Sequence, residues 1–341
     1  MDLPIIWFVI IAIFWTGFFV LEGFDFGVGA LHSVVGKDET ERRVAINTIG
    51  PFWDANEVWL IVGGAAIFAA FPSWYATMFS GLYLAMLLIL VALIIRGVSF
   101  EWRGKGKTQR WRNSWSGTMT VGSILAPLLL GVGLGDLLVG LPINADEQFT
   151  GTFWNLLTPY GLLTGVFLLL MCIIHGATFM GMKTTGDVRV RSRMIASRLS
   201  YLGFVVALGW AAWTHYLGSR SVLAIFFSLL AVLPILYVAP ALSAGKEGRA
   251  FAASAVAIGS SVAMIFASLY PNVMVSSTDA ANNLTVAGTA SGSYALGVMT
   301  VVAVVLFPIV LLYQAWNYWV FRKRVSAPPA TPPQEDAKTS A

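Results

Sequence analysis

The sequence predicts an all-α, polytopic membrane protein with about nine transmembrane helices. Of its 341 residues, 57% are hydrophobic and only 11% are charged, whereas about a quarter of the residues in soluble domains are charged. A membrane span needs about 20 mostly apolar residues, and several uncharged stretches exceed that length. The longest are Val58–Ile95 with 38 residues, Gln148–Met182 with 35 and Ala280–Phe321 with 42.

Charges, prolines and glycines divide the chain into nine helical segments. A basic loop that contains Lys37 ends the first, Pro51 precedes the second, and Pro72 separates the second from the third. Basic loops flank the fourth and fifth, while short turns at Arg220 and Lys246 bound the seventh. The predicted segments lie near residues 4–35, 52–71, 75–96, 115–135, 156–182, 198–217, 221–241, 250–270 and 295–321.

Lysine and arginine are concentrated in every second connection. The first, third, fifth and seventh connections hold three, six, five and two of them, and the C-terminal end holds four, which makes 20 of the 21. The opposite side of the membrane holds only Arg220. Because basic residues stay on the cytoplasmic side, we predict that the N-terminus is outside and the C-terminus is cytoplasmic. Eight or ten helices would break this alternation.

The connections are short, so we expect one integral membrane domain over residues 1–324. Paired prolines after residue 325 predict a disordered cytoplasmic tail over 325–341. The two longest external connections, near 136–155 and 271–294, either cap a partner surface or simply join helices, and we favour the second interpretation.

A distant internal similarity suggests how the helices are grouped. Gly23–Phe26 near the end of the first segment resembles Gly176–Phe179 near the end of the fifth, and each precedes a basic loop. The offset of 153 residues also superposes the second segment on the sixth. We therefore predict two four-helix units followed by a ninth helix.

Four carboxylates fall within the predicted spans. Glu22 and Asp25 lie three residues apart on the first helix, and Asp54 and Glu57 lie three apart at the start of the second. This spacing places the members of each pair on nearly the same helical face. Because the first helix runs inward and the second begins at the cytoplasmic side, we expect the four groups to converge near the inner surface.

Ionisable groups at membrane depth are expensive and usually functional. Crowded carboxylates in a medium of low dielectric constant can carry protons near neutral pH, so Asp25, Asp54, Glu57 and Glu22 are candidates for a proton pathway. In the alternative interpretation, Arg42 and Arg43 of the first loop neutralise two of them and the others are solvated at the interface. The sequence leaves both interpretations open.

The cysteine and histidine content limits the redox and metal chemistry of this chain. A single cysteine, Cys172, excludes an intrachain disulfide and a thiolate-held metal cluster. His32 and His175 lie near the inner ends of two helices and could face each other as haem ligands, while His215 lies near an outer end. We favour ordinary hydrogen-bonded helix histidines, and predict no catalytic, metal-binding or cofactor-binding residue in this chain.

Several uncommon motifs follow one another along the chain: Gly23–Gly29, Glu41–Arg43 with Asn47, Pro51–Leu60, Phe79–Gly81, Arg96–Glu101, Trp111–Trp115, Pro271–Ser277 and Leu312–Trp316. Their order and spacing resemble subunit II of the cytochrome bd quinol oxidases. The resemblance covers nearly the whole chain to Arg324, and only a tight turn near Arg220 stands where some relatives are longer.

This resemblance implies a heterodimeric terminal oxidase of the bacterial cell (inner) membrane that oxidises quinol and reduces dioxygen to water. In the family, subunit I carries two b-type haems and one d-type haem and oxidises the quinol, whereas subunit II holds no redox haem. Subunit II is expected to complete the membrane core and contribute to proton delivery through Glu22, Asp25, Asp54 and Glu57. A structural quinone or lipid, a small accessory subunit and membrane lipids are further expected partners, and nucleic acid is not.

A self-contained proton-coupled transporter is the alternative. Two similar halves and buried acidic residues would suit it. Against it, we expect no charged residue deep in the third, fourth, seventh, eighth or ninth span that could coordinate a substrate.

Overall fold

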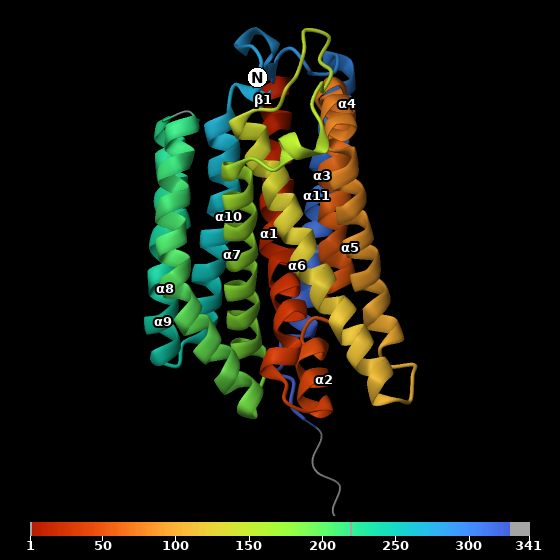
Figure 1. The fold of residues 1–341 in the computed structure, drawn as a ribbon, viewed down its shortest axis with the longest axis vertical. Helices are drawn as coiled ribbons and strands as arrows, with labels where there is room; N and C mark the ends of the chain where they lie inside the picture. Colours follow the sequence, from red (N-terminus) through yellow and green to blue (C-terminus); the bar gives the residue numbers. More distant parts are fainter. Residues whose placement is uncertain (1, 219, 328–341) are drawn as a thin grey trace, which may run out of the picture.

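The structure is a computed structural model that describes residues 2–218 and 220–327. In this part of the chain, α-helices run nearly parallel to one long axis (Figure 1). They are α1 Leu3–Val35, α2 Glu39–Asn47, α3 Trp53–Ala70, α4 Pro72–Gly81, α5 Tyr83–Trp102, α6 Gln109–Val139, α7 Pro159–Lys183, α8 Gly186–Leu217, α9 Val222–Ser243, α10 Glu247–Leu269 and α11 Ser293–Val320. Two 3-10 turns, Phe153–Leu156 and Ala280–Asn282, and two short strands, β1 Asn272–Met274 and β2 Leu284–Thr285, complete the described elements.

The all-α membrane fold predicted from the sequence is confirmed. Among the described residues nine helices have 18 or more residues, and eight of these are long and apolar enough to cross a membrane. The ninth is α3, whose 18 residues begin with a turn and a half that contains Asp54, Asn56 and Glu57. These polar residues lower the apolar character of α3, although it packs along α1 as α6, α7 and α10 do.

Local sequence signals explain where several helices begin. The side chain of Asp38 accepts a hydrogen bond from the main-chain N–H of Glu41 and caps α2. Thr158 and Ser221 cap α7 and α9 in the same way. Such caps satisfy main-chain donors that have no partner within the helix. Pro72 separates α3 from α4 because its ring cannot continue the hydrogen bonding of a preceding helix.

The helices form two units with related packing, which differ in that α8 packs against α9 in the second unit whereas α3 and α5 have no comparable contact in the first. In the first unit α1 packs against α3 and α6, and α5 packs against α6; in the second, α7 packs against α8 and α10, and α9 packs against α10. The predicted arrangement of two four-helix units plus a last helix is therefore confirmed. The two units meet mainly through α7, which packs against both α6 and α1, and α1 also packs against α10. In Figure 1 α1 and α7 lie in the centre of the bundle.

Two glycines allow α1 and α7 to approach closely. A side chain at Gly27 would overlap the main chain of Cys172, and a side chain at Gly176 would overlap the main chain of Gly27. Small residues at helix contacts are typical of membrane bundles, where association depends on close packing. This contact brings the inner halves of α1 and α7 together.

The two ends of the bundle differ in chemistry. The end that carries α2, the α5–α6, α7–α8 and α9–α10 turns and the C-terminal segment is the basic end, opposite β1 and α4 (Figure 1). At the other end the two long connections bind each other: Leu141 N–H donates to the Val275 carbonyl oxygen (3.0 Å), and Ser277 N–H donates to the Leu141 carbonyl oxygen (2.9 Å). The connections thus form a joint cover over the outer end.

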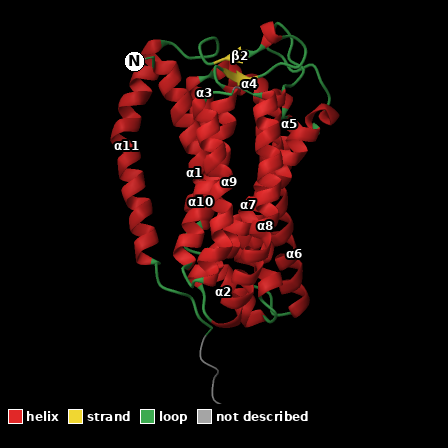
Figure 2. Cartoon of the chain, turned by 90° about the vertical axis from the view of Figure 1, so that its left-hand side faces the viewer, coloured by secondary structure: helices red, strands yellow, loops and turns green. Residues whose placement is uncertain are grey.

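The last helix, α11, runs along the outside of the bundle (Figure 2). Nearly all the residues of its most apolar stretch are exposed at the surface of this chain. Polar contacts fix its two ends. Trp7 Nε1 donates to Thr300 Oγ1 (3.0 Å) near the outer end. At the basic end, Lys183 Nζ donates to the carbonyl oxygens of Phe321 and Lys323.

The predicted disordered tail falls mostly on residues 328–341, which lie outside the described residues. Its first residue, Val325, donates a main-chain hydrogen bond of 2.7 Å to the Lys183 carbonyl oxygen.

Candidate functional site

Three of the four predicted carboxylates lie close together in the inner half of the first unit, and two of them contact one arginine. Glu22 and Asp25 on α1 are fully buried, and so is Arg96 on α5. Arg96 Nη1 lies 2.6 Å from Glu22 Oε1 and 3.4 Å from Glu57 Oε2. We call Glu22, Asp25, Glu57 and Arg96 the carboxylate cluster.

The guanidinium group of Arg96 is held by aromatic rings as well as by acids. Its central carbon lies 4.8 Å from the ring centroid of Phe26 and 5.3 Å from that of Phe100. A planar cation over ring faces is favourable where water is excluded. This packing fixes the one cation that the buried acids share.

Asp25 is held by an amide from α3. The side-chain Nδ2 of Asn56 donates to Asp25 Oδ2 (2.7 Å) and to the Leu21 carbonyl oxygen (3.1 Å). The side-chain Oδ1 of Asn56 accepts from Gln314 Nε2 and from the Tyr318 hydroxyl, each at 2.9 Å. Three helices, α1, α3 and α11, therefore contribute to one hydrogen-bonded group.

The predicted pair on α3 does not act as a unit. Asp54 is exposed and forms no ion pair with any described residue, whereas Glu57 retains 21% of its side-chain exposure and reaches Arg96. In order from the surface inward, the carboxylates are Asp54, then Glu57, then the buried pair. The expected convergence is correct for three groups, and Asp54 stands outside them.

The alternative in which Arg42 and Arg43 neutralise the acids is wrong in the part of the chain that the structure describes. Arg42 donates instead to the Gly36 carbonyl oxygen (3.2 Å) and to Asn113 Oδ1 (3.2 Å). The expectation that the third span has no deep charge is also wrong, because α5 continues past residue 96 and carries Arg96 within its length. The apolar run that marked this span ends at Ile95, which made Arg96 look like a loop residue.

Several polar atoms of the carboxylate cluster have no hydrogen-bond partner among the described residues. They are Glu22 Oε2, Asp25 Oδ1, Arg96 Nε and Arg96 Nη2. Buried polar atoms are usually paired. The two carboxyl oxygens can therefore accept a hydrogen bond from water or a proton, and the two guanidinium nitrogens, which stay protonated, can donate to water. Three carboxyl groups share a single cation here, and full ionisation would leave buried charge uncompensated. Proton exchange is the chemistry that this arrangement supports.

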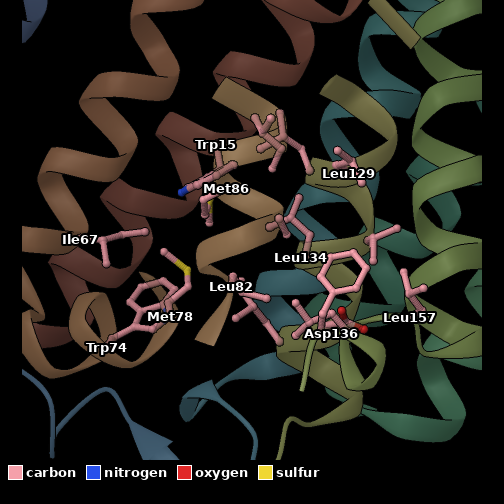
Figure 3. A pocket seen from close by; sticks show the side chains of 18 of the residues that line it. Trp15, Ile67, Trp74, Met78, Leu82, Met86, Leu129, Leu134, Asp136 and Leu157 are labelled. Atoms are coloured by element: carbon pink, nitrogen blue, oxygen red, sulfur yellow. The ribbon is translucent and has the colours of Figure 1, made fainter. Parts of the chain in front are cut away.

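A second polar group lies near the outer end. Asp136 on α6 is buried, its Oδ1 accepts from Thr158 Oγ1 (2.6 Å), and its Oδ2 is unpaired among the described residues. It lies at the edge of an otherwise apolar cavity of about 40 Å³ (Figure 3). A groove of about 750 Å³ shares residues with this cavity and lies between α3 and α4–α5; the shared residues include Trp15, Met78 and Met86.

Comparison with known proteins identifies the family. The family described as cytochrome bd terminal oxidase subunit II matches residues 3–321. The chain belongs to this family. It is 44% identical over 325 residues to cytochrome bd ubiquinol oxidase subunit 2 of Bacillus subtilis, covering 94% of this chain and 96% of that protein. It is 38% identical over 362 residues to cytochrome bd-I ubiquinol oxidase subunit 2 of Escherichia coli, covering 95% of each.

The fold agrees with this membership. A solved structure of the bd oxidase from Geobacillus thermodenitrificans matches 95% of this chain and 100% of its own chain, with a TM-score of 0.74 at 18% identity. The resemblance inferred from the motifs is therefore confirmed. This protein is a subunit of a terminal oxidase in the bacterial inner membrane, and its family places it in a complex with a partner, subunit I. The family does not support the transporter alternative.

The histidines of this cytochrome bd subunit do not face each other as a ligand pair. His175 Nδ1 bonds Ser254 Oγ (2.7 Å), and Nε2 lies 3.1 Å from the Val20 carbonyl oxygen. His32 Nδ1 lies 2.7 Å from the Gly29 carbonyl oxygen, and Nε2 lies 3.0 Å from Ser33 Oγ. Each ring nitrogen already has a partner. In the described residues, no group of three or more His, Cys, Asp or Glu side chains could hold a metal ion.

Sequence reasoning missed Arg96 and Asn56. A signal for Arg96 existed: three acids at membrane depth require a cation, and Arg96 is the first one after the apolar run that begins at Val58. Asn56 gave no comparable signal because a neutral amide between two acids is unremarkable in sequence. The contributions of Gln314 and Tyr318 depend on the packing of α11, which the sequence pattern does not specify.

Proposed function

We propose that the carboxylate cluster of this subunit takes up protons from the cytoplasm and passes them toward the dioxygen-reducing site of its partner. Reduction of dioxygen to water consumes protons, so a quinol oxidase needs such a path. The proposal is supported by the burial of Glu22 and Asp25 near Arg96 at the basic end. Glu57, which also contacts Arg96, is partly exposed and lies between this buried pair and the surface. Asp54, exposed at the start of α3, is the first group on this path.

The acidic start of α3 indicates where the partner docks. Asp54 and Glu57 lie on a helix that faces away from the second unit, and carboxylates that face lipid are expensive. Subunit I covers this face of α3 in our proposal and receives the protons there. The haems b and d and the quinol-oxidising site belong to subunit I, and this chain binds none of them. A small accessory subunit and annular lipids complete the proposed complex.

The apolar groove between α3 and α4–α5 gives this subunit a second, structural role. Its volume of about 750 Å³ and its lining of aliphatic and aromatic side chains suit the chain of a quinone or lipid. We propose that such a molecule stabilises the outer half of the first unit and takes no part in turnover.

Two conservative substitutions test the proton path. Asp54→Asn and Glu57→Gln preserve size and most hydrogen bonding but remove proton exchange at that position. We expect quinol-dependent oxygen consumption per haem to fall ten-fold or more in each variant, which corresponds to about 1.4 kcal/mol or more in barrier. Asp54→Asn should be the more damaging, because Asp54 is nearer the cytoplasm.

Asp187→Asn is the matched control, since the Asp187 side chain is 79% exposed on α8 at the same end. The haem spectrum of the complex should be unchanged in all three variants. Parallel loss of haem and activity would indicate a structural role for the acids. Activity per haem within two-fold of the parent in both test variants would exclude a proton-carrying role at these two residues.

A further inference from the structure

The amide of Asn56 can adopt only one orientation in this environment. Its Oδ1 accepts two hydrogen bonds, from Gln314 Nε2 and from the Tyr318 hydroxyl, and its Nδ2 donates two, to Asp25 Oδ2 and to the Leu21 carbonyl oxygen. Reversal of the amide would place Oδ1 against two acceptors and Nδ2 against the donor amide of Gln314. All four bonds favour the same state, in which a donor faces Asp25.

The two donors come from a helix that has little other contact with the bundle. On α11 the only buried residues are Leu296, near the outer end, and Gln314. Tyr318 also stacks on Phe52, with ring centroids 4.6 Å apart and an interplanar angle of 7°. Asn317 Nδ2 donates to the Pro51 carbonyl oxygen (3.2 Å). The inner half of α11 therefore contacts the segment that leads into α3, just before Asn56.

We propose that Gln314 and Tyr318 are positioning residues for proton uptake, which fix the Asn56 amide so that its Nδ2 faces Asp25. The inference rests on the proposed role of Asp25 in the proton path. A fixed N–H donor stabilises the carboxylate form of Asp25, because a hydrogen bond donated to a charged group favours the charged form. Through Asn56, the last helix then influences the equilibrium between the protonated and the ionised form of Asp25.

Other groups near Asp25 do not replace this contact. Arg96 pairs with Glu22 and Glu57, and its Nε and Nη2 have no hydrogen-bond partner among the described residues. The titratable and charged groups near Asp25 are Glu22 on α1, Glu57 on α3, Arg96 on α5 and Tyr318 on α11. On α7, Cys172 and His175 lie beside Gly23 instead. In the described residues the hydrogen bond from Asn56 is the one bond that Asp25 Oδ2 accepts from another side chain.

The test is the pH profile of oxygen consumption per haem in the assembled oxidase. Tyr318→Phe removes one hydroxyl, and the double variant Tyr318→Phe with Gln314→Leu removes both donors to Asn56. The part of the profile in which activity changes as the carboxylate cluster titrates should move to higher pH, because the carboxylate form of Asp25 is less well stabilised. We expect a shift of about half a pH unit or more in the double variant. Whether Asp25 must be charged or protonated for turnover, the shift has the same sign.

Tyr313→Phe is the matched control, since Tyr313 lies on the same helix, is 60% exposed and makes no hydrogen bond to Asn56. Its profile should coincide with that of the parent. If the double variant fails to assemble with haem, the single Tyr318→Phe variant decides, because it removes one oxygen atom and keeps the ring that stacks on Phe52.

Asp25→Asn separates this inference from the proposed function. An unchanged pH profile in Tyr318→Phe and in the double variant, with turnover lost in Asp25→Asn, would overturn the positioning role and leave the proton path intact. Full turnover in Asp25→Asn would overturn both. A loss of rate without a pH shift would mean that α11 only holds the structure together.

Discussion

The two four-helix units place different chemistry at related positions. Glu22 and Asp25 on α1 are each 153 residues before His175 and Thr178 on α7, and all four side chains are fully buried. In the first unit the carboxylate cluster contains ionisable groups with unpaired atoms. In the second, His175 and Thr178 bond Ser254 Oγ at 2.7 and 3.0 Å, and we call these three residues the histidine site.

The two sites differ in how many of their polar atoms are hydrogen-bonded and in whether they reach the surface. Both ring nitrogens of His175 are hydrogen-bonded, and its ring stacks on Phe251 with centroids 4.5 Å apart. The carboxylate cluster instead leaves four polar atoms unpaired among the described residues and reaches the surface through Glu57. A saturated, neutral site holds helices together, whereas an unsaturated, charged site with a route outward can move protons.

Loss of the shared cation should have the largest effect. Arg96→Gln leaves buried carboxylates without a counter-charge, and breaking a buried ion pair on one side costs about 3–5 kcal/mol. We expect the yield of haem-containing complex to fall more than ten-fold. Arg110→Gln, at an exposed arginine of the same end, should have no effect.

Glu22→Gln combined with Arg96→Gln sharpens this result, because it removes charge on both sides. Assembly should recover in part while turnover stays low. If Arg96→Gln alone assembled at the parental level, the buried carboxylates would not need their cation. The proposed difference between the charged site of the first unit and the neutral site of the second would then be wrong.

The histidine site should respond in the opposite way. His175→Phe keeps an aromatic ring against Phe251 but removes the hydrogen bonds to Ser254 and to the Val20 carbonyl oxygen, at a cost of about 1–3 kcal/mol. We expect a lower thermal unfolding temperature of the purified complex, with oxygen consumption per haem within two-fold of the parent. A ten-fold loss of turnover at normal haem content would place His175 in the functional machinery.

A surface pair between the units should have the smallest effect. The Arg191 side chain beside Glu41, at 2.5 Å, lowers the pKa of that carboxyl below its ordinary value of 4.5. The pair therefore contributes stability above the pKa of Glu41 in the unfolded chain, and this contribution is lost as the pH falls through the lower pKa of the folded state. Exposed pairs contribute about 1 kcal/mol or less.

Glu41→Gln tests this pair directly. The variant should be slightly less stable than the parent at pH 7 and equally stable below the depressed pKa, as measured by thermal unfolding across pH. A difference that persisted unchanged at low pH would mean that Glu41 acts through packing instead of charge.

The sequence was sufficient for the architecture because membrane depth and basic loops leave a clear pattern. The spacing of Glu22 and Asp25 correctly predicted one buried face, and the offset of 153 residues correctly predicted two units. On α3 the same spacing failed for Asp54, because Asn56 faces inward between the two acids and Glu57 bends toward Arg96.

The rest of the site required tertiary contacts. The apolar run ends just before Arg96, so the sequence pattern assigned this residue to a loop. In the structure α5 continues for six residues beyond Arg96. Gln314 and Tyr318 are more than 250 residues from Asn56 in the chain, and nothing in their local sequence shows which helix they meet. A pattern along one helix indicates its faces but not its partners.

We propose that the first unit carries protons and the second does not, and one pair of variants distinguishes the two units most directly. Asp25→Asn and Thr178→Val change the equivalent residues of the two units, and oxygen consumption per haem is measured in the assembled oxidase. We expect a loss of ten-fold or more for Asp25→Asn and a change of less than two-fold for Thr178→Val, with the haem spectrum unchanged in both. Turnover of Asp25→Asn within two-fold of the parent, or equal losses in the two variants, would contradict it.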